Sequence, residues 1–586
     1  MFHLVARASF KFSIVSTDHS HPMQTMTNEI QKLKTEGNAF FVQKKYFEAC
    51  AKYSEGILLG ADDNPILYAN RAACRIAMSL YMDALEDARK ATEIDPTYPK
   101  GWFRLASALE GIGQYAQSVT MYEKTIKVLS ELPTPPIALK KECEVNLARA
   151  RKAVVPWTGR PEHGIEVKID SGLLPWQAAE KILSESSVVS RSVCSLPRSL
   201  SVRHQVESFL KSAWSIFFAN KDFMEASGKL KEMKRVGTSE NLQTVKARLG
   251  VLEDMSNALL RDSRVFRVQE SDFLMKLNDQ VRSEANHFKA WSPETGPEIL
   301  QGEVMKRLWK EGWDSVRPAL THIVRHWIIA GYVISRVVNN FQLGVEFHRN
   351  ALNMINWGRK VWKDVPKSER GVIFDLSFRR GVWNMYLDTL IGASAHVGIE
   401  DLVLLETIFA EADALLQDLE KNPYDPNDFD HPDPGFKLSF FETIKGNAFA
   451  SKALYHNMLG NFGKDQKVET VRKHYTSAME LYILAAACLP EDDENHPWYL
   501  NCAYNFMETA NAPTSLVMDV LEKIRISVPT MQKIWCQNPS HTKKFREDVY
   551  VKLLKIEEHA KSLIAHEVIT LEGPFNWSII KTLPLV

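Results

Sequence analysis

Apolar side chains recur every three or four residues along most of this chain, which is the spacing of one face of an α-helix. Over residues 30–132, small and aromatic residues also recur at intervals of about 34 residues. In the first repeat Gly37 is the small residue at which two helices would cross, and Ala49 and Tyr53 follow at a small and an aromatic position. The matching positions of the next two repeats hold Ala72, Ala84, Ala91 and Pro96, then Trp102, Leu105, Ala106 and Tyr122. This pattern predicts three stacked helical hairpins, an α-solenoid.

A further helical pattern over residues 137–151 would cover the apolar end of the stack, so we expect a repeat domain over residues 27–153. Helical periodicity resumes at residue 204 and continues to residue 586 without a β-hairpin signal. Thirteen of the fourteen tryptophans lie outside the repeats, enough apolar surface for a second core. Within this region residues 441–489 indicate another repeat-like hairpin. The predicted fold is therefore all-α, with a large helical C-terminal domain over residues 204–586.

Two segments lack this pattern. The basic and apolar stretch Met1–Ser16 is too short and irregular to count as a presequence, so residues 1–26 are predicted to be a flexible tail, or translation starts at Met23 or Met26. Residues 154–203 are rich in proline and serine and predict a linker with one short helical stretch. In that linker Arg191, Ser195 and Pro197 match a phosphoserine-reader pattern, although an unmodified spacer is the expectation for so serine-rich a segment.

Composition limits the partners. The chain has 586 residues with 72 Lys plus Arg and 72 Asp plus Glu, so no overall charge attracts nucleic acid or an anionic membrane. The longest apolar run outside the N-terminus, Trp327–Ile334, is far too short to span a bilayer. Seven cysteines without a Cys-x-x-Cys pair fit a reducing compartment. The prediction is a cytoplasmic protein that binds neither nucleic acid nor a membrane.

Five polar residues fall on the first helix of successive repeats and would line one groove: Lys34, Asn38, Asn70, Lys100 and Arg104. Residues four apart on a helix share a face, so Lys34 lies beside Asn38, and Lys100 lies beside Arg104. Three cations that converge repel one another unless an anion is bound. Two adjacent carboxylates, as at the end of a chain that finishes in Asp, fit these donors best.

The strings at residues 33–40, 67–73 and 99–104 read Leu-Lys-Thr-Glu-Gly-Asn-Ala-Phe, Leu-Tyr-Ala-Asn-Arg-Ala-Ala and Pro-Lys-Gly-Trp-Phe-Arg. They resemble the carboxylate-clamp tetratricopeptide domains of heat-shock co-chaperones of the heat-shock-organising, stress-inducible family. The resemblance covers residues 27–153 and departs from the family by one extra residue near Ala61, in a turn between repeats. It implies that the five residues above, here called the clamp residues, hold the C-terminal Glu-Glu-Val-Asp tail of cytosolic heat-shock chaperones. By repeat register, Phe41, Ala73 and Ile76 would form an apolar recess for the tail's valine.

Motifs with catalytic chemistry are weak. His322 and His326 are four apart on a predicted helix, but without a third ligand a packing pair is the better interpretation than a metal site. Residues 425–435 are acidic yet lack the sixth-position glycine and closing glutamate of a calcium loop. Residues 111–116 match a dinucleotide fingerprint only superficially and predict a turn, and residues 392–396 have histidine where a nucleophile elbow needs glycine. We predict no catalytic residues, no metal and no cofactor.

Three hypotheses follow. In the favoured one the protein is a non-catalytic adaptor that docks on chaperone tails through the repeats and binds a client or second partner through residues 204–586. In the second, the C-terminal domain is a helical enzyme whose site residues, for example His322, His326, Glu406 and Asp413, converge only in three dimensions. In the third, the repeats are a scaffold without clamp activity. Organellar import receptors share the clamp but are anchored by a membrane helix, which this sequence lacks.

Overall fold

The computed structural model describes residues 21–61, 63–154, 173–193, 211–236, 244–268, 270–397, 402–429, 432–463, 467–535, 543–575 and 577–578. The chain forms two compact units, Met1–Pro156 and Trp157–Val586. Each unit is considered by itself below. Most of the predicted tail, and Ser195 and Pro197 of the predicted linker, lie outside the described residues.

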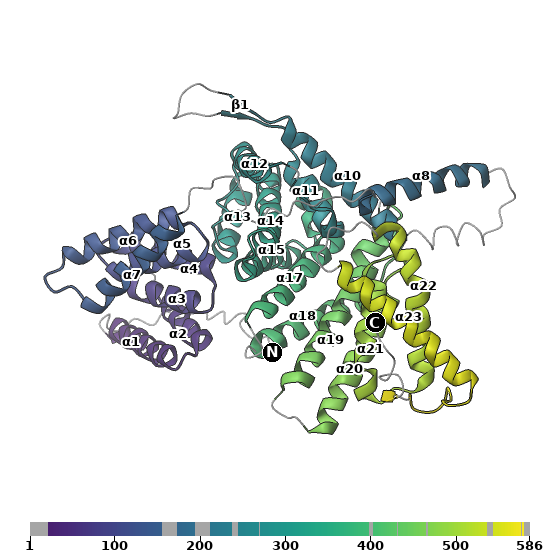
Figure 1. Ribbon diagram of the computed structural model, residues 1–586. Coiled ribbons are helices and arrows are strands. Elements are labelled where there is room, and N and C mark those ends of the chain that lie inside the picture. Colours follow the sequence, from purple (N-terminus) through teal and green to yellow (C-terminus); the bar gives the residue numbers. More distant parts are fainter. Residues whose placement is uncertain are drawn as a thin grey trace. The chain divides into compact units, whose positions relative to one another are not determined.

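The first unit consists of consecutive helices that pack in sequence order, each against the next (Figure 1). Their bounds are α1 (His21–Val42), α2 (Tyr46–Leu58), α3 (Pro65–Ala77), α4 (Tyr81–Ile94), α5 (Pro99–Gly111), α6 (Tyr115–Ser130) and α7 (Ile137–Ala153). The first helices of neighbouring repeats, α3 and α5, also pack on each other. These helices therefore form the inner layer of a solenoid, as the sequence pattern predicts.

Small residues allow the two helices of a repeat to approach. A Cβ atom added at Gly37 would lie 2.6 Å from Cε1 of Tyr53, so only glycine fits beneath that ring. In the second repeat Ala72, Ala84 and Ala91 are fully buried. Larger side chains at these positions would separate the helices, because close-packed interiors leave no room for extra methyl groups.

The turns inside the three hairpins share one backbone conformation. Each has a residue in the left-handed region just after the first helix, at Lys44 (φ 60°), Ser79 (φ 58°) and Gly113 (φ 79°). These positions are 35 and 34 residues apart, so the turn repeats with the same period as the helices. The glycine-rich segment at residues 111–116 is the end of α5 and this turn, as predicted, and not a phosphate-binding loop.

The predicted cap is present. Helix α7 contributes Cys143, Leu147 and Ala150 to an apolar cluster with Phe103, Ala106 and Tyr122 of the third repeat. Helix α7 thereby covers the apolar face of the third repeat, which would otherwise be exposed to water at the end of the stack. Two further clusters lie between the earlier helices, so the core runs along the whole first unit.

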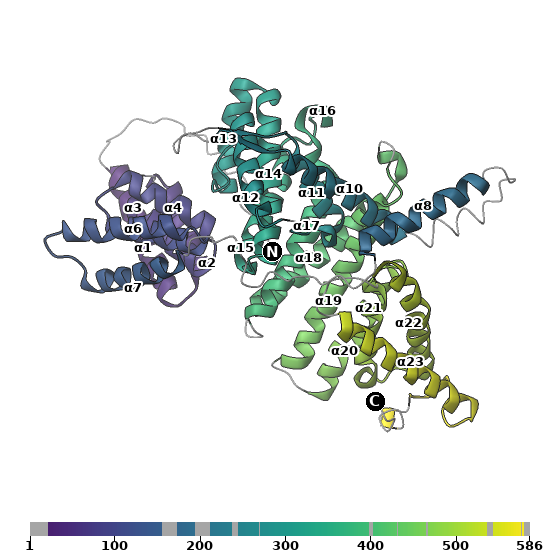
Figure 2. The same ribbon diagram turned by 45° about the horizontal axis from the view of Figure 1, so that its top comes forward.

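The second unit is a larger helical assembly (Figure 1). Its elements up to the middle of the unit are α8 (Pro175–Val193), α10 (Lys211–Lys231), β1 (Lys234–Val236), β2 (Thr244–Lys246), α11 (Val251–Asp262), η1 (Ser263–Val265), α12 (Phe273–Phe288), α13 (Pro297–Glu311), α14 (Trp313–Arg336), α15 (Phe341–Val361), α16 (Lys367–Arg370) and η2 (Val372–Phe374). The remaining elements are α17 (Leu376–Val397), α18 (Leu402–Lys421), η3 (Pro426–Asp428), the π-helix η4 (Leu438–Glu442), α19 (Thr443–Phe462), α20 (Val468–Ala487), α21 (Asn495–Ala510), α22 (Thr514–Trp535) and α23 (Lys543–Ala565). Figure 2 shows α16, which packs on α14 and η2.

Consecutive helices of this unit pack as antiparallel pairs, most extensively α19 with α20, α20 with α21, and α10 with α11. The hairpin predicted over residues 441–489 corresponds to α19 and α20. Gly446 lies where these helices cross, since an added Cβ would be 3.0 Å from the carbonyl oxygen of Ala485. The described residues are thus almost entirely helical, in agreement with the predicted all-α solenoid class. None of the described helices is long and apolar enough to span a membrane.

One detail differs from the prediction. The segment read as free of β-hairpins contains a short antiparallel pair in which Lys234 lies opposite Lys246. Strands of three residues are too short for alternation to reveal them. The short helical stretch expected in the linker corresponds to α8, which is longer than expected, packs on α10 and α22, and buries Trp176 and Ala179.

Candidate peptide-carboxylate site

The clamp residues all lie on the inner-layer helices of the first unit. Lys34 and Asn38 are one turn apart on α1, Asn70 is on α3, and Lys100 and Arg104 are one turn apart on α5. Asn38 and Lys100 are exposed and the other three are half-buried. This placement agrees with the groove predicted from repeat register, and their role in binding remains a prediction.

Hydrogen bonds join the first two inner helices and orient an amide. The hydroxyl of Tyr53 donates to Oδ1 of Asn38 at 2.7 Å, and Nδ2 of Asn70 donates to the same oxygen at 3.2 Å. Burial raises the pKa of Tyr53, so the hydroxyl keeps its proton and remains a donor. Because both bonds use the oxygen of Asn38, both N–H groups of that amide remain available to an acceptor in the groove.

The three clamp cations form no ion pair in the described part of the chain. No carboxylate lies within ion-pair distance of Lys34, Lys100 or Arg104 among the described residues. By contrast Arg71, the residue next to Asn70, is held by Asp87 on α4 with a bond of 2.7 Å from Nη2 to Oδ1. The sequence Asn-Arg-Ala thus contains one residue that faces the groove and one that ties α3 to α4.

Arg104 lies in a partly desolvated position near α3. Burial lowers the pKa of this guanidinium below its ordinary value, although arginine stays charged. Its positive charge also opposes the burial that raises the pKa of Cys74 to about 12. Cys74 is one turn after Asn70, so Arg104 and Asn70 lie close together across the α3–α5 contact. A half-buried cation gains more from an anion than an exposed one, because water screens it less.

The same tyrosine-centred bond occurs in the third repeat. The hydroxyls of Tyr122 and Ser107 are 3.2 Å apart. Tyr122 follows Ser107 by fifteen residues, just as Tyr53 follows Asn38. Tyr122 also donates to Oε2 of Glu110 at 2.9 Å. In the second repeat the tyrosine position is Ala88, which is fully buried. The bond is therefore a recurring device, and only in the first repeat does it orient a clamp residue.

The predicted valine recess is spread over two apolar clusters. Phe41 packs edge-on against Tyr46, with ring centroids 5.3 Å apart, beside the cluster of the first repeat. Ile76 packs against the cluster of the second repeat, and Ala73 is 7% exposed. The three residues lie on the inner helices α1 and α3 as expected, and a pocket formed by them stays a prediction.

The histidines considered as metal ligands are buried on α14. Nδ1 of His322 lies 4.0 Å from Oε2 of Glu284, and burial lowers the pKa of His322 and His326 to about 4. The described residues contain no group of three or more His, Cys, Asp or Glu side chains arranged to hold a metal ion. Asp413, proposed to approach these histidines in an enzyme, instead pairs with Lys452 at 2.5 Å.

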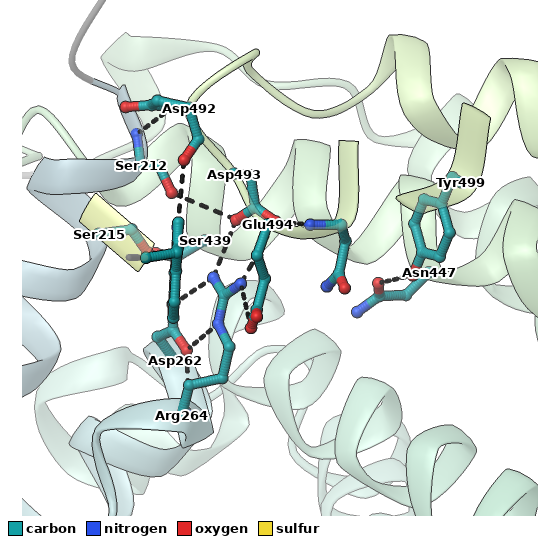
Figure 3. A network of polar contacts seen from close by, with 12 residues as sticks. Ser212, Ser215, Asp262, Arg264, Ser439, Asn447, Asp492, Asp493, Glu494 and Tyr499 are labelled. Carbon is teal, nitrogen blue, oxygen red and sulfur yellow. Dashed lines mark hydrogen bonds and ion pairs between the residues drawn. The ribbon is translucent and has the colours of Figure 1, made fainter. Parts of the chain in front are cut away.

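A buried ionic network lies elsewhere in the second unit (Figure 3). Arg264 donates from Nε to Oδ1 of Asp262 at 2.9 Å and from Nη2 to Oδ2 of Asp493 at 2.9 Å. The hydroxyl of Ser212 donates to Asp493 at 3.2 Å, and its backbone N–H donates to Asp492 at 3.3 Å. Burial raises the pKa of Asp492 to about 7, and the adjacent charge of Asp493 adds to the shift. Asp262 and Asp493 neutralise Arg264, and Asp492 and Asp493 accept from Ser212 at the start of α10, which accounts for the perturbed pKa values without a reaction.

Comparison with known proteins gives matches to the repeats. The heat shock protein sti1 homolog of Schizosaccharomyces pombe is 42% identical over 98 residues, which are 17% of this chain and 16% of that protein. The N-terminal unit resembles the repeat domains of Sti1-type co-chaperones. The heat-shock protein cognate co-chaperone sgt12 of Aspergillus fumigatus is 41% identical over 101 residues, which are 17% of this chain and 29% of that protein. The solved Sgt2 tetratricopeptide-repeat domain from Aspergillus fumigatus is 34% identical and covers 22% of this chain and 85% of that chain, with a TM-score of 0.19.

No family model matches the chain. This chain spans less than a third of the length of either of these two relatives, so the Sti1-type likeness concerns the repeats alone. The sequence indicated the resemblance of the repeats to these co-chaperones, but the hydrogen bond from Tyr53 to Asn38 was not predicted. The signal was present, because an aromatic residue fifteen positions after a polar inner-face residue occurs in both the first and the third repeat.

Proposed function

We propose that this protein is a non-catalytic co-chaperone adaptor whose first unit binds the C-terminal Glu-Glu-Val-Asp tail of cytosolic heat-shock chaperones. The ninety-kilodalton class is the first candidate and the seventy-kilodalton class the second. The observation that carries the proposal is the set of three inner-face cations without an ion pair among the described residues, beside the Asn38 amide, whose N–H groups stay available because its oxygen accepts both bonds. The names of the Sti1-type relatives, which are heat-shock proteins or their co-chaperones, support it.

The chemistry of such a tail matches these donors. Its last residue carries the terminal carboxylate and the aspartate carboxylate on adjacent atoms, so one residue presents two anionic groups. Lys100 and Arg104 on α5 would bind one of them. Lys34, with the amides of Asn38 and Asn70, would bind the other. The proposal predicts that affinity depends mainly on the charged end of the peptide.

The second unit has a different role in this proposal. We propose that it binds a client or a second protein partner and that the adaptor acts in the cytoplasm, without a cofactor. The perturbed carboxylates Asp492, Asp493 and Glu494 belong to the buried network around Arg264. One alternative is a helical enzyme that the repeats tether to chaperones. The other alternative is a scaffold without clamp activity.

The deciding experiment titrates a peptide ending in Glu-Glu-Val-Asp into the full-length protein by calorimetry. We expect a dissociation constant on the order of micromolar, as for a short tail held by its charged end. The same peptide with an amidated C-terminus should bind at least about tenfold more weakly, because one charge-assisted interaction is lost. Equal affinity for the two peptides would contradict the proposal.

The role of the second unit needs a separate measurement. Affinity capture from cytosol with the Lys100→Ala, Arg104→Ala double variant of the full chain should lose the chaperones and retain partners of the second unit. A matched control is the Lys124→Ala, Lys127→Ala double variant, because these residues lie on α6 rather than on the inner layer. If both double variants lose the same proteins, chaperone capture does not depend on the clamp.

A further inference from the structure

A second group of cations in the second unit has more positive charge than its carboxylates neutralise. It lies where the end of α15, the short helix α16, the turn η2 and the start of α17 come together (α16 is labelled in Figure 2). Arg359 is on α15, Arg370 is the last residue of α16, and Arg379 is on α17. All three are half-buried.

Backbone contacts bring Arg359 beside η2. Nη1 of Arg359 donates to the carbonyl oxygen of Phe374, the last residue of η2. Gly358 makes this approach possible, because a Cβ there would lie 2.2 Å from the ring of Phe374. The ring of Trp362 packs on Phe374 with centroids 5.4 Å apart and is 4% exposed, so it forms a rigid floor beneath this segment.

Arg379 reaches the same side of α15. Its Nε donates to Oδ1 of Asn356 at 2.8 Å, and Asn356 is one helical turn before Arg359. The positive charges of Arg379 and Arg370 add to the burial that lowers the pKa of Arg359. Arg359 is therefore close enough to both other guanidinium groups for their positive charges to repel its own.

The nearby carboxylates are already engaged. Asp418 accepts from Arg379 at 2.8 Å and from Arg380 at 2.8 Å, and Asp375 pairs with Lys367 at 2.7 Å. Arg359 and Arg370 have no ion pair among the described residues. Nε of Arg370 is buried and has no hydrogen-bond partner there. A buried guanidinium N–H without an acceptor is costly, and in native proteins such a group calls for a partner such as a water molecule or an ion.

We propose that Arg359, Arg370 and Arg379 form an oxyanion site that binds a phosphate monoester. Guanidinium forks bind phosphate with paired hydrogen bonds, and forks from three elements approach from different directions. A phosphate monoester has three terminal oxygens in a tetrahedral arrangement and a charge near −2, so it can accept from all three. A planar carboxylate, by contrast, pairs its two oxygens with only one guanidinium group. The terminal N–H groups of Arg359 and Arg370 that have no partner among the described residues supply the free donors.

The test is ligand-dependent stabilisation of the full-length protein. Thermal unfolding is recorded with inorganic phosphate and with O-phosphoserine, each against chloride at equal ionic strength. Arg370→Gln and Arg359→Gln should bind phosphate about tenfold more weakly or worse, because each removes charge-assisted hydrogen bonds. Lys363→Gln is the control, because it removes one positive charge from a nearby side chain that is 74% exposed and is not part of the proposed site. It should keep the stabilisation of the wild type.

Phosphate also stabilises proteins through exclusion from their surface, but that effect is the same for all variants. Equal stabilisation of the wild type and Arg370→Gln would overturn the proposal. A ³¹P NMR line-width titration gives a second readout that does not depend on melting. If Arg370→Gln unfolds, Arg370→Lys keeps the charge but loses the fork, and retention of full phosphate binding by it would also overturn the proposal. A larger shift with O-phosphoserine than with phosphate would assign the site to a phosphorylated side chain, and the reverse would assign it to free phosphate.

Discussion

The bond from Tyr53 to Asn38 makes a prediction that separates binding from stability. Tyr53→Phe removes only the hydroxyl that donates to Oδ1 of Asn38 at 2.7 Å. The ring, which fills the space beneath Gly37, is kept. Asn38 then retains one of its two orienting bonds, the one from Asn70 at 3.2 Å. Its amide becomes free to rotate and to turn its oxygen toward the groove.

The size of the effect follows from the bond that is lost. A neutral hydrogen bond contributes about 0.5–1.5 kcal/mol net. If that energy holds the amide with its N–H groups toward the ligand, affinity for the Glu-Glu-Val-Asp peptide should fall by about threefold to tenfold. The free energy of unfolding of the first unit should fall by a similar amount, because the hydroxyl is buried and Tyr53 is 1% exposed.

Tyr122→Phe is the matched control. It removes the equivalent hydroxyl in the third repeat, which contacts Ser107 and donates to Glu110 rather than to a clamp residue. We expect a comparable loss of stability and no change in peptide affinity. Affinity is measured by calorimetry well below the melting temperature of both variants. The reasoning is refuted if both variants weaken the peptide equally, or if Tyr53→Phe leaves its affinity unchanged.

Three further predictions concern charge. Asn38→Asp places a carboxylate beside the ligand's own, so peptide binding should fall by about tenfold or more, measured by calorimetry. Lys100→Ala and Arg104→Ala should each weaken the peptide by about 1–3 kcal/mol, while thermal melts stay close to the wild type because neither residue is in a core cluster. Asp492→Asn should stabilise the second unit at neutral pH. The folded-state pKa of Asp492 is raised to about 7, so the wild type loses stability as pH rises from about 4 to about 7. Urea unfolding should show the advantage of the variant growing by about 2 kcal/mol between about pH 5 and about pH 8, and a constant difference would contradict the assignment.

The repeat domain could be predicted from sequence because its determinants are local. Gly37 and Tyr53 are sixteen residues apart and meet within one hairpin, so the small and aromatic positions recur with the repeat. The same register placed Lys34 and Arg104 on inner helices. Short-range helical geometry alone was enough for both conclusions.

The parts that escaped prediction depend on distant contacts. Only a short helical stretch was indicated where α8 lies, because the burial of Trp176 that supports the longer helix depends on packing against α10 and α22. The ion pair of Arg264 with Asp493 joins residues 229 positions apart, and no periodicity indicates such a partner. The arginines of the proposed oxyanion site likewise come together through the turn at Phe374, whose conformation depends on Gly358.

The network around Arg264 has a consequence for how the chain is made. Ser212 and Asp493 are separated by 281 positions, and the ring of Trp535 lies 4.3 Å from the guanidinium of Arg264. Contacts of such high sequence separation form late, because the intervening chain must first be ordered. During synthesis the first unit, whose contacts are local, can fold while the second still lacks its anchoring residues. A ribosome-bound chain would thus expose a finished repeat domain before the second unit has formed, and that domain could engage a chaperone tail while its own partner domain is still unfolded.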